Sequence, residues 1–266
     1  AQGFQEVVLT GIHLGSYGMD IKRSANLVDI LKNIHSIEGI RRIRIGSLEP
    51  MDFAPTIVDE MATFPKLMPH FHLPIQAGAD KTLERMHRRY STEAYGFLVN
   101  RIRERFPDAA ITTDVMVGFP GESDEDFADS LHFCEAMQFT QMHVFRYSPR
   151  DGTPAASYPN QIPGDVAAAR SQAMIAVGLK TGRAFRESMI GKTMNVLIEQ
   201  SRDERGCLTG YTENYIRTAV DVPERFIGRI IPVRLTGIDG DLMTSELLES
   251  DELSASARHL SVLTQA

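Results

Sequence analysis

Residues whose side chains could take part in binding or catalysis are concentrated where five successive β-strand patterns end. Because the carboxyl ends of parallel strands meet at one edge of an α/β sheet, we predict a ligand pocket there. Glycine and proline also turn a chain after a strand, but turning does not require the acidic and amide side chains in these regions: Glu49, Gln76, Asp114 and Glu122. The strand-end segments are TGIHLGSYG (Thr10–Gly18), SLEP (Ser47–Pro50), PIQAGAD (Pro74–Asp80), VGFPGE (Val117–Glu122) and RYSPRDGTPAA (Arg146–Ala156).

Two histidines, His70 and His72, lie two residues apart in a strand pattern and so share one face. Such a pair could bind a divalent metal. A partly buried, hydrogen-bonded histidine pair explains the same spacing, and only one further histidine, His13, follows a strand. We therefore expect no metal centre, and a metal-dependent barrel hydrolase stays an alternative that rests on these two side chains.

Positive charge is concentrated between Asp80 and Arg105, a segment with seven basic and four acidic residues. Arg85, Arg88 and Arg89 stand together in the sequence RMHRRY. Such a run is usually the solvated face of a helix, but arginines at this density can also contact a phosphate backbone.

Strand and helix patterns alternate up to Tyr147, which predicts parallel strands joined by helical crossovers. Ser123 and Asp126 have the spacing of a capping box that opens a helix. The predicted strands are Glu6–Thr10, Arg42–Gly46, His70–Pro74, Ala110–Phe119 and Met142–Tyr147. Helices are predicted around Leu27–Ile34, over Thr56–Thr63, twice within Lys81–Phe106, over Ser123–Met137 and over Asp165–Ser188.

Short strand patterns separated by turns follow Thr193 and predict a small closed β-barrel. The strand patterns are TMNVLIEQ, CLTGYT, YIRTAV, RIIPVRLTG and LMTSELL. From Ser250 the sequence is small and polar, which predicts a frayed tail. We thus expect a domain at 1–188, a small β-barrel at 189–249 and a tail at 250–266.

The composition is typical of a soluble globular protein, because 42% of the 266 residues are hydrophobic and 24% are charged. No apolar run approaches the ~18 residues of a membrane span, and the N-terminus carries no secretory signal. Two isolated cysteines, Cys134 and Cys207, favour a reducing cytosol, so we expect a cytoplasmic protein. The net charge of −7 does not favour nucleic-acid binding but leaves a local basic face open.

The strand-end motifs resemble, in the same order, those of the radical S-adenosylmethionine (SAM) methylthiotransferases. The resemblance runs from about Glu6 to Glu249. The HLGSYG loop is most similar to the branch that methylthiolates N6-threonylcarbamoyladenosine beside the tRNA anticodon. The segment GYTENYIRTAV (Gly210–Val220) resembles the family's TRAM domain, which holds tRNA.

The resemblance implies a partial (β/α) barrel of the radical SAM type, with SAM and a four-iron four-sulfur (4Fe-4S) cluster as cofactors. In the family the cluster cleaves SAM to a 5′-deoxyadenosyl radical, which abstracts a hydrogen from adenine before a methylthio group is inserted at C2. A Cys-x3-Cys-x2-Cys loop after the first strand holds that cluster through three thiolates.

This chain has no such loop, and its strand EVVLTG matches the family's second strand. We therefore expect a barrel without its first strand, with the N-terminal half of the enzyme upstream of Ala1. The fragment alone should be inactive.

The resemblance also implies contacts for each cofactor and partner. The resemblance places four residues near the methionine end and the sugar of SAM: Thr10, Gly11, Ser47 and Glu49. Along the family's Gln-Ser-Gly-Ser stretch and near adenine it places Gln76, Gly78, Asp114, Gly118 and Glu122. Both serines of that stretch are alanines here, Ala77 and Ala79. After the last strand, Arg146, Tyr147 and Ser148 would close the pocket.

For the tRNA anticodon stem-loop, the basic residues Arg85, Arg88, Arg89, Lys192, Arg217, Arg229 and Arg234 are the expected contacts. Besides a methylthiotransferase fragment, two function classes stay open. The missing cysteines favour a non-catalytic RNA-binding module, whereas the retained strand-end motifs favour a catalytic origin. The barrel hydrolase built on His70 and His72 is the third class, and metal analysis would separate it from the other two.

Overall fold

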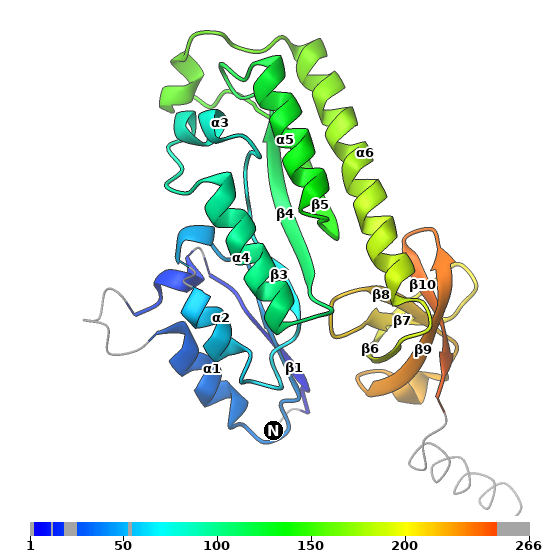
Figure 1. Cartoon of the computed structure of the whole chain (residues 1–266). Helices are drawn as coiled ribbons and strands as arrows, with labels where there is room; N and C mark the ends of the chain where they lie inside the picture. The colour runs from blue at the N-terminus through cyan, green and yellow to red at the C-terminus, as the bar shows by residue number, and fades with distance from the viewer. Residues whose placement is uncertain (1–2, 12, 19–25, 53–54, 249–266) are drawn as a thin grey trace, which may run out of the picture. The chain divides into compact units, whose positions relative to one another are not determined.

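The computed structural model describes residues 3–11, 13–18, 26–52 and 55–248. The chain divides into two compact units, Ala1–Arg186 (unit 1) and Glu187–Ala266 (unit 2) (Figure 1). The tail expected from Ser250 onward lies outside the described residues.

Unit 1 is built on five parallel strands, as the alternating patterns predict. The strands are β1 (Glu6–Leu9), β2 (Arg42–Ile45), β3 (His70–His72), β4 (Ala110–Val117) and β5 (Gln141–Arg146). β1 pairs with β2, and β4 pairs with both β3 and β5. Isolated parallel bridges at Ile43–Leu67 and Ser47–His72 connect β2 to β3. Within the described residues no strand pairs with the other edge of β1, so the sheet is open rather than an eight-stranded closed barrel.

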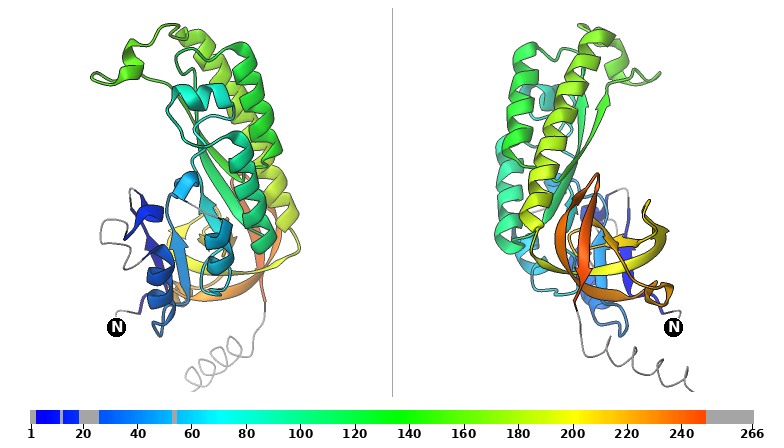
Figure 2. Two further views of the ribbon diagram at one scale, coloured as in Figure 1. Left: turned by 60° about the vertical axis from the view of Figure 1, so that its left-hand side comes forward. Right: turned by 90° about the vertical axis from the view of Figure 1, so that its right-hand side faces the viewer.

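The helices of unit 1 lie where the periodicity places them. They are α1 (Leu27–His35), α2 (Pro55–Met61), α3 (Asp80–Arg85), α4 (Thr92–Arg105), α5 (Asp124–Ala136) and α6 (Gly164–Met189), with 3₁₀ turns at Leu14–Ser16, Pro50–Asp52 and Pro154–Ser157. The capping box at Ser123 and Asp126 is confirmed, because the side chain of each accepts the backbone N–H of the other. Figure 2 shows α4, α5 and α6 along the same face of β4 and β5.

The helix-covered face of the sheet forms the core of unit 1. Ile43, Phe71, Ile111 and Val115 point to that face and are almost fully buried. Since side chains alternate along a strand, the residues directly before and after each of these four point to the opposite face. That opposite face carries charged and polar groups, and below we call it the inner face.

Two clusters of charged and polar side chains occupy the inner face. Arg42 and Arg44 are both only 2% exposed, and they lie 3.6 and 3.0 Å from the carboxylate of Glu6. On β3, His72 Nδ1 lies 2.9 Å from the hydroxyl of Thr112, and its Nε2 lies 3.5 Å from Asp114 Oδ2. Of the two histidines, His72 is thus hydrogen-bonded to a neighbouring strand. Among the described residues no group of three His, Cys, Asp or Glu side chains could hold a metal ion.

Unit 2 contains a small closed barrel, as the short strand patterns predict. Its strands are β6 (Thr193–Arg202), β7 (Leu208–Tyr211), β8 (Arg217–Val220), β9 (Ile230–Asp239) and β10 (Leu242–Leu247), with a 3₁₀ turn at Glu224–Phe226. They close in the order β10-β8-β7-β6-β9. The interior is filled by apolar side chains that include Val196, Ile198, Val233, Leu235 and Met243.

In the described part of the chain, no helix is both long enough and apolar enough to cross a membrane.

A first prediction concerns the barrel. At Gly210, β7 approaches β6 so closely that an added Cβ would collide with the carbonyl oxygen of Leu197 and lie 2.8 Å from Val196 Cγ1. We expect Gly210→Ala to destabilise unit 2 by about 2 kcal/mol or more, because backbone cannot yield as a side chain does. Urea unfolding followed by circular dichroism measures this. Gly164→Ala is the control, since a Cβ added there would meet nothing within 4 Å; equal stabilities of the two variants would contradict the prediction.

A second prediction concerns acid. Burial lowers the pKa of His70 to about 3, assisted by the charge of Arg44 and by His72. In the unfolded chain the same ring takes up a proton near pH 6.5. Stability contributed by the neutral ring is therefore complete above that pH and is lost as the pH falls below it. Between pH 7 and pH 5 we expect the free energy of unfolding of unit 1 to fall by about 2 kcal/mol more in the wild type than in His70→Gln.

Urea titrations at the two pH values measure this difference. His132→Gln, which changes an exposed histidine, should keep the acid sensitivity of the wild type. An unchanged sensitivity in His70→Gln would show that His70 is protonated in the folded state.

Candidate functional site

The carboxyl ends of all five strands of unit 1 are tied into one edge by backbone hydrogen bonds that continue past the strands. This edge is where the sequence motifs predict a pocket, and below we call it the strand-end edge. The bonds run from Gly46 N to Leu9 O, from Leu48 N to His72 O, from Met116 N to Gln76 O and from Tyr147 N to Val117 O, at 2.7–3.0 Å.

The first two strand ends offer accessible groups. Thr10 and Gly11 are exposed after β1, and Ser47 is exposed after β2. Glu49 is half-buried, and its carboxylate lies 3.5 Å from Arg88 Nη1. Arg88 therefore lies at this edge of unit 1. The contact brings Arg88, which is expected to bind RNA, next to Glu49, which is expected to bind the cofactor.

Gln76 holds an unusual backbone conformation at the end of β3. Its φ is +68°, in the left-handed region that a residue with a side chain seldom adopts. The strand register enforces it, because Gln76 N donates to Asp114 O at 2.9 Å while Gln76 O accepts from Met116 N at 2.8 Å. Backbone strain of this kind clusters at functional sites.

A pocket of about 670 Å³ opens between the ends of β4 and β5 and the start of α6. This volume lies within the range of about 300–1,000 Å³ that is typical of small-molecule sites. Its lining residues are Gly118, Arg146, Tyr147, Ser148, Pro149, Ala156, Gln161, Ile162, Gly164 and Ala167. Four of them, Gly118 and Arg146–Ser148, were expected from the sequence.

Two features of the pocket wall stand out. Gly118 has a φ of +73°, and an added Cβ would lie 2.9 Å from the Cβ of Ala167. Only glycine lets the β4 turn approach α6 this closely. Among the described residues, the hydroxyl of Tyr147 is one of the few buried polar atoms with no hydrogen-bond partner. A buried donor without a partner is costly, so this atom marks a weak point of the packing beside the pocket.

Glu122 has a role in the turn that the sequence analysis did not predict. Turning was not expected to require this carboxylate, but Glu122 Oε2 accepts the N–H of Gly118 at 2.7 Å and so closes the VGFPGE turn. The same oxygen accepts from Arg170 Nη1 at 2.7 Å. Glu122 is 3% and Arg170 6% exposed. Burial raises the pKa of Glu122, and the Gly118 N–H and Arg170 oppose that shift.

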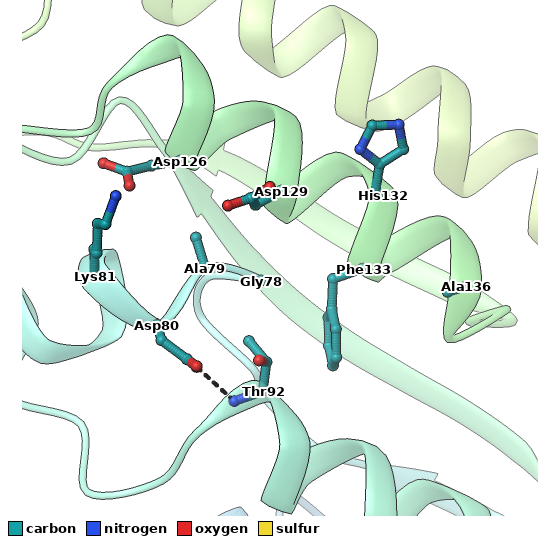
Figure 3. A pocket seen from close by; sticks show the side chains of 10 residues that line it. All are labelled: Gly78, Ala79, Asp80, Lys81, Thr92, Asp126, Asp129, His132, Phe133 and Ala136. Atoms are coloured by element: carbon teal, nitrogen blue, oxygen red, sulfur yellow. Dashed lines mark hydrogen bonds between the residues drawn. The ribbon is translucent and has the colours of Figure 1, made fainter.

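Gly78 lies against a helix. Its N–H donates to Ser130 Oγ at 2.8 Å, and an added Cβ would lie 2.8 Å from the carbonyl oxygen of Ser130 on α5. Gly78 lines a second pocket of about 490 Å³ between α3, α4 and α5, shown in Figure 3. There Asp80 accepts the N–H of Thr92 at 2.7 Å. The structure thus places Gly78 and Gly118 in the walls of two different pockets.

The basic residues expected to contact RNA differ in their surroundings. Arg85 lies 3.1 Å from Asp126, Arg88 3.5 Å from Glu49 and Arg234 3.8 Å from Glu246. Lys192 is half-buried. The remaining members of the set are exposed: Arg89, Arg217 and Arg229.

Sequence reasoning missed Arg170 and the arginines of the inner face. Arg42 and Arg44 were visible as the charged positions of the alternating segment RIRI, which could have shown that one face of β2 is ionic. Arg170 had no local signal, since its partner Glu122 lies 48 residues earlier.

Comparisons with known proteins identify a matching family model and related sequences. Residues 2–134 match the model of the radical SAM superfamily. Over 89% of its length the chain is 37% identical to a tRNA-2-methylthio-N(6)-dimethylallyladenosine synthase of Pelotomaculum thermopropionicum, of which it covers 53%. Over 88% it is 34% identical to the threonylcarbamoyladenosine tRNA methylthiotransferase MtaB of Bacillus subtilis, of which it covers 52%.

The chain thus spans about half the length of the curated relatives it matches. Among solved structures, the radical SAM methyltransferase TsrM of Kitasatospora setae, determined with cobalamin and a [4Fe-4S] cluster, aligns with a TM-score of 0.47 and 19% identity over 58% of this chain and 30% of that one. Because the matched family model takes in half of the residues, the protein belongs to the radical SAM superfamily.

Proposed function

We propose that unit 1 binds SAM along the strand-end edge, with the adenosine end in the pocket between β4, β5 and α6. The observation that carries this proposal is the pocket itself, which has the size of a small-molecule site and a wall formed by the close approach of Gly118 to Ala167. A flat purine fits against a wall that has no Cβ.

The other strand ends would hold the rest of the molecule. Thr10, Gly11 and Ser47 are exposed groups at the β1 and β2 ends, where the amino-acid part and the sugar would lie. Asp114 and the strained Gln76 stand between those ends and the pocket. Gly78 and Glu122 would act indirectly, since Gly78 packs on α5 and Glu122 shapes the β4 turn.

Members of the superfamily also use a 4Fe-4S cluster, which supplies the electron that cleaves SAM. The residues of this chain do not fit that group. Of the two cysteines, Cys134 is buried in the core of unit 1, with burial raising its pKa to about 12, and Cys207 belongs to unit 2. Three thiolates at one site are required, and the two cysteines of this chain do not supply them.

For the whole protein we propose tRNA methylthiolation at C2 of N6-threonylcarbamoyladenosine beside the anticodon, with the anticodon stem-loop as partner. The HLGSYG loop and the Bacillus subtilis relative support this substrate. The Pelotomaculum thermopropionicum relative supports N6-dimethylallyladenosine as a second candidate. The barrel of unit 2 would act as a TRAM-like tRNA contact, in the cytoplasm.

The adenosine pocket predicts nucleoside binding without a cluster. 5′-Methylthioadenosine, which lacks the amino-acid end of SAM, should bind the chain with a measurable heat in titration calorimetry. Ser148→Trp places a bulky ring on the exposed lining of the pocket and should weaken binding about tenfold or more. Ser157→Trp, on the same exposed loop but outside the lining, is the matched control and should bind as the wild type does. Equal affinities of both variants would contradict the placement.

RNA binding should be salt-dependent and divided between the units. In a filter-binding assay with tRNA, affinity should fall about tenfold to a hundredfold between 50 and 200 mM salt if two to four phosphates are contacted. Arg89→Glu in unit 1 and Arg217→Glu in unit 2 should each weaken binding, and the double variant more. Lys180→Glu changes an exposed lysine outside the proposed set and should have little effect. An affinity that is independent of salt would refute this part of the proposal.

A further inference from the structure

We propose that two stacked tyrosines of the small barrel, Tyr211 and Tyr215, form a platform that stacks an unpaired nucleobase of RNA. We call them the tyrosine pair. The proposal rests on the RNA-binding part of the proposed function and is independent of the SAM pocket. It names a contact surface and a ligand class, a purine or pyrimidine ring in a single-stranded segment.

The tyrosine pair is a near-parallel stack that reaches solvent through Tyr215, whereas Tyr211 is half-buried. The ring centroids lie 4.4 Å apart with the planes inclined by 15°. Tyr211 ends β7, and Tyr215 stands in the turn before β8 with 44% of its surface exposed. Aromatic rings in proteins prefer offset-stacked or edge-to-face arrangements, and this pair is of the stacked kind. A near-parallel pair at the surface is the geometry that a third aromatic ring can extend, and bases stack on aromatic side chains in this way.

The turn holds Tyr215 in a strained conformation. Its φ is +64°, which a bulky side chain seldom adopts. Thr212 fixes this turn, since its carbonyl accepts from Tyr215 N at 3.1 Å and its hydroxyl accepts from Ile216 N at 2.9 Å. The same hydroxyl donates to Asn214 Oδ1 at 2.6 Å, and Thr212 and Asn214 are completely buried. The buried hydrogen bonds of Thr212 and Asn214 thus hold Tyr215 in its strained backbone conformation. In this conformation its ring lies at the surface.

A positive charge lies next to the platform. Arg217 pairs directly with Tyr211 in the register between β7 and β8 and is exposed. The neighbouring acid, Glu213, is directed to Asn195, whose backbone N–H and side-chain amide it binds at 2.6–3.1 Å. A base stacked on the pair would therefore have a guanidinium nearby for its phosphate.

The charge of the barrel explains why stacking should matter here. Residues 189–249 carry seven basic and ten acidic side chains, so few phosphates can be engaged. Phosphate contacts dominate the affinity of most nucleic-acid interfaces. In a barrel with this charge a larger share of the affinity has to come from base stacking, which does not depend on net charge.

The experiment uses the complete chain, which contains no tryptophan. Tyr215→Trp then provides a single fluorescent ring in the platform. Titration with a single-stranded oligoadenylate of about eight nucleotides should quench its emission at least twofold at saturation. Leu179→Trp, at a position that is 64% exposed on α6, is the control and should change little.

Three further variants separate stacking from folding. Tyr215→Phe should keep the RNA affinity within about twofold, and Tyr215→Leu should lose about tenfold, since only the first retains an aromatic face. Tyr215→Gly relieves the strained φ, so it should fold at least as well as the wild type and still lose the affinity. A sugar–phosphate strand of the same length without bases should bind the wild type as weakly as RNA binds Tyr215→Gly.

Four results would overturn the platform: absence of RNA binding, unchanged tryptophan emission at saturation, wild-type affinity in Tyr215→Leu and Tyr215→Gly, or equal binding of the strand without bases. Quenching by a proline-rich peptide but not by RNA would assign the pair to a protein ligand instead. Binding of 5′-methylthioadenosine to unit 1 is measured separately, so failure of the platform and failure of the proposed SAM site are distinguishable.

Discussion

The hydrogen-bond register of β4 is the constraint on which the candidate site depends. β4 is paired on both sides, and its bonds continue beyond the strand to Gln76 on one neighbour and Tyr147 on the other. A slip of one residue would turn every side chain of the strand to the opposite face. Asp114 would then leave the inner face, and Gly118 would no longer meet Ala167. The location of the pocket is thus decided by backbone pairing before any ligand is bound.

A buried ion pair fixes the end of that strand. Arg170 binds the backbone and side chain of Glu122 and also the carboxylate of Asp124. It thereby fastens the first turns of α6 to the start of α5 and to the VGFPGE turn. Such a pair adds little net stability compared with apolar packing, but removing one partner leaves a buried charge that is expensive. Its evident result here is a fixed distance between the turn and the helix that together form the pocket wall.

Most of the fold was predictable because its determinants are local. Apolar periodicity located the strands and helices of unit 1, the capping box at Ser123 located the start of α5, and turn residues separated the strands of the small barrel. The strand-end edge was predictable for the same reason, since parallel strands can end only at a common edge. The roles of Gly78 and Glu122 were not, because each is defined by a partner on a distant helix, Ser130 and Arg170. Stacking of Tyr211 on Tyr215 likewise depends on the positive φ of Tyr215, which no sequence pattern predicted.

The burial of Cys134 makes this residue a reporter of motion in unit 1. Its thiol is fully enclosed, and its high pKa keeps it in the unreactive thiol form. Cys207 is half-buried and reaches solvent more easily. A thiol reagent will therefore modify the barrel first and reach Cys134 only when the core opens. The delay between the two reactions measures how often the helices separate from the sheet, without any label that disturbs the packing.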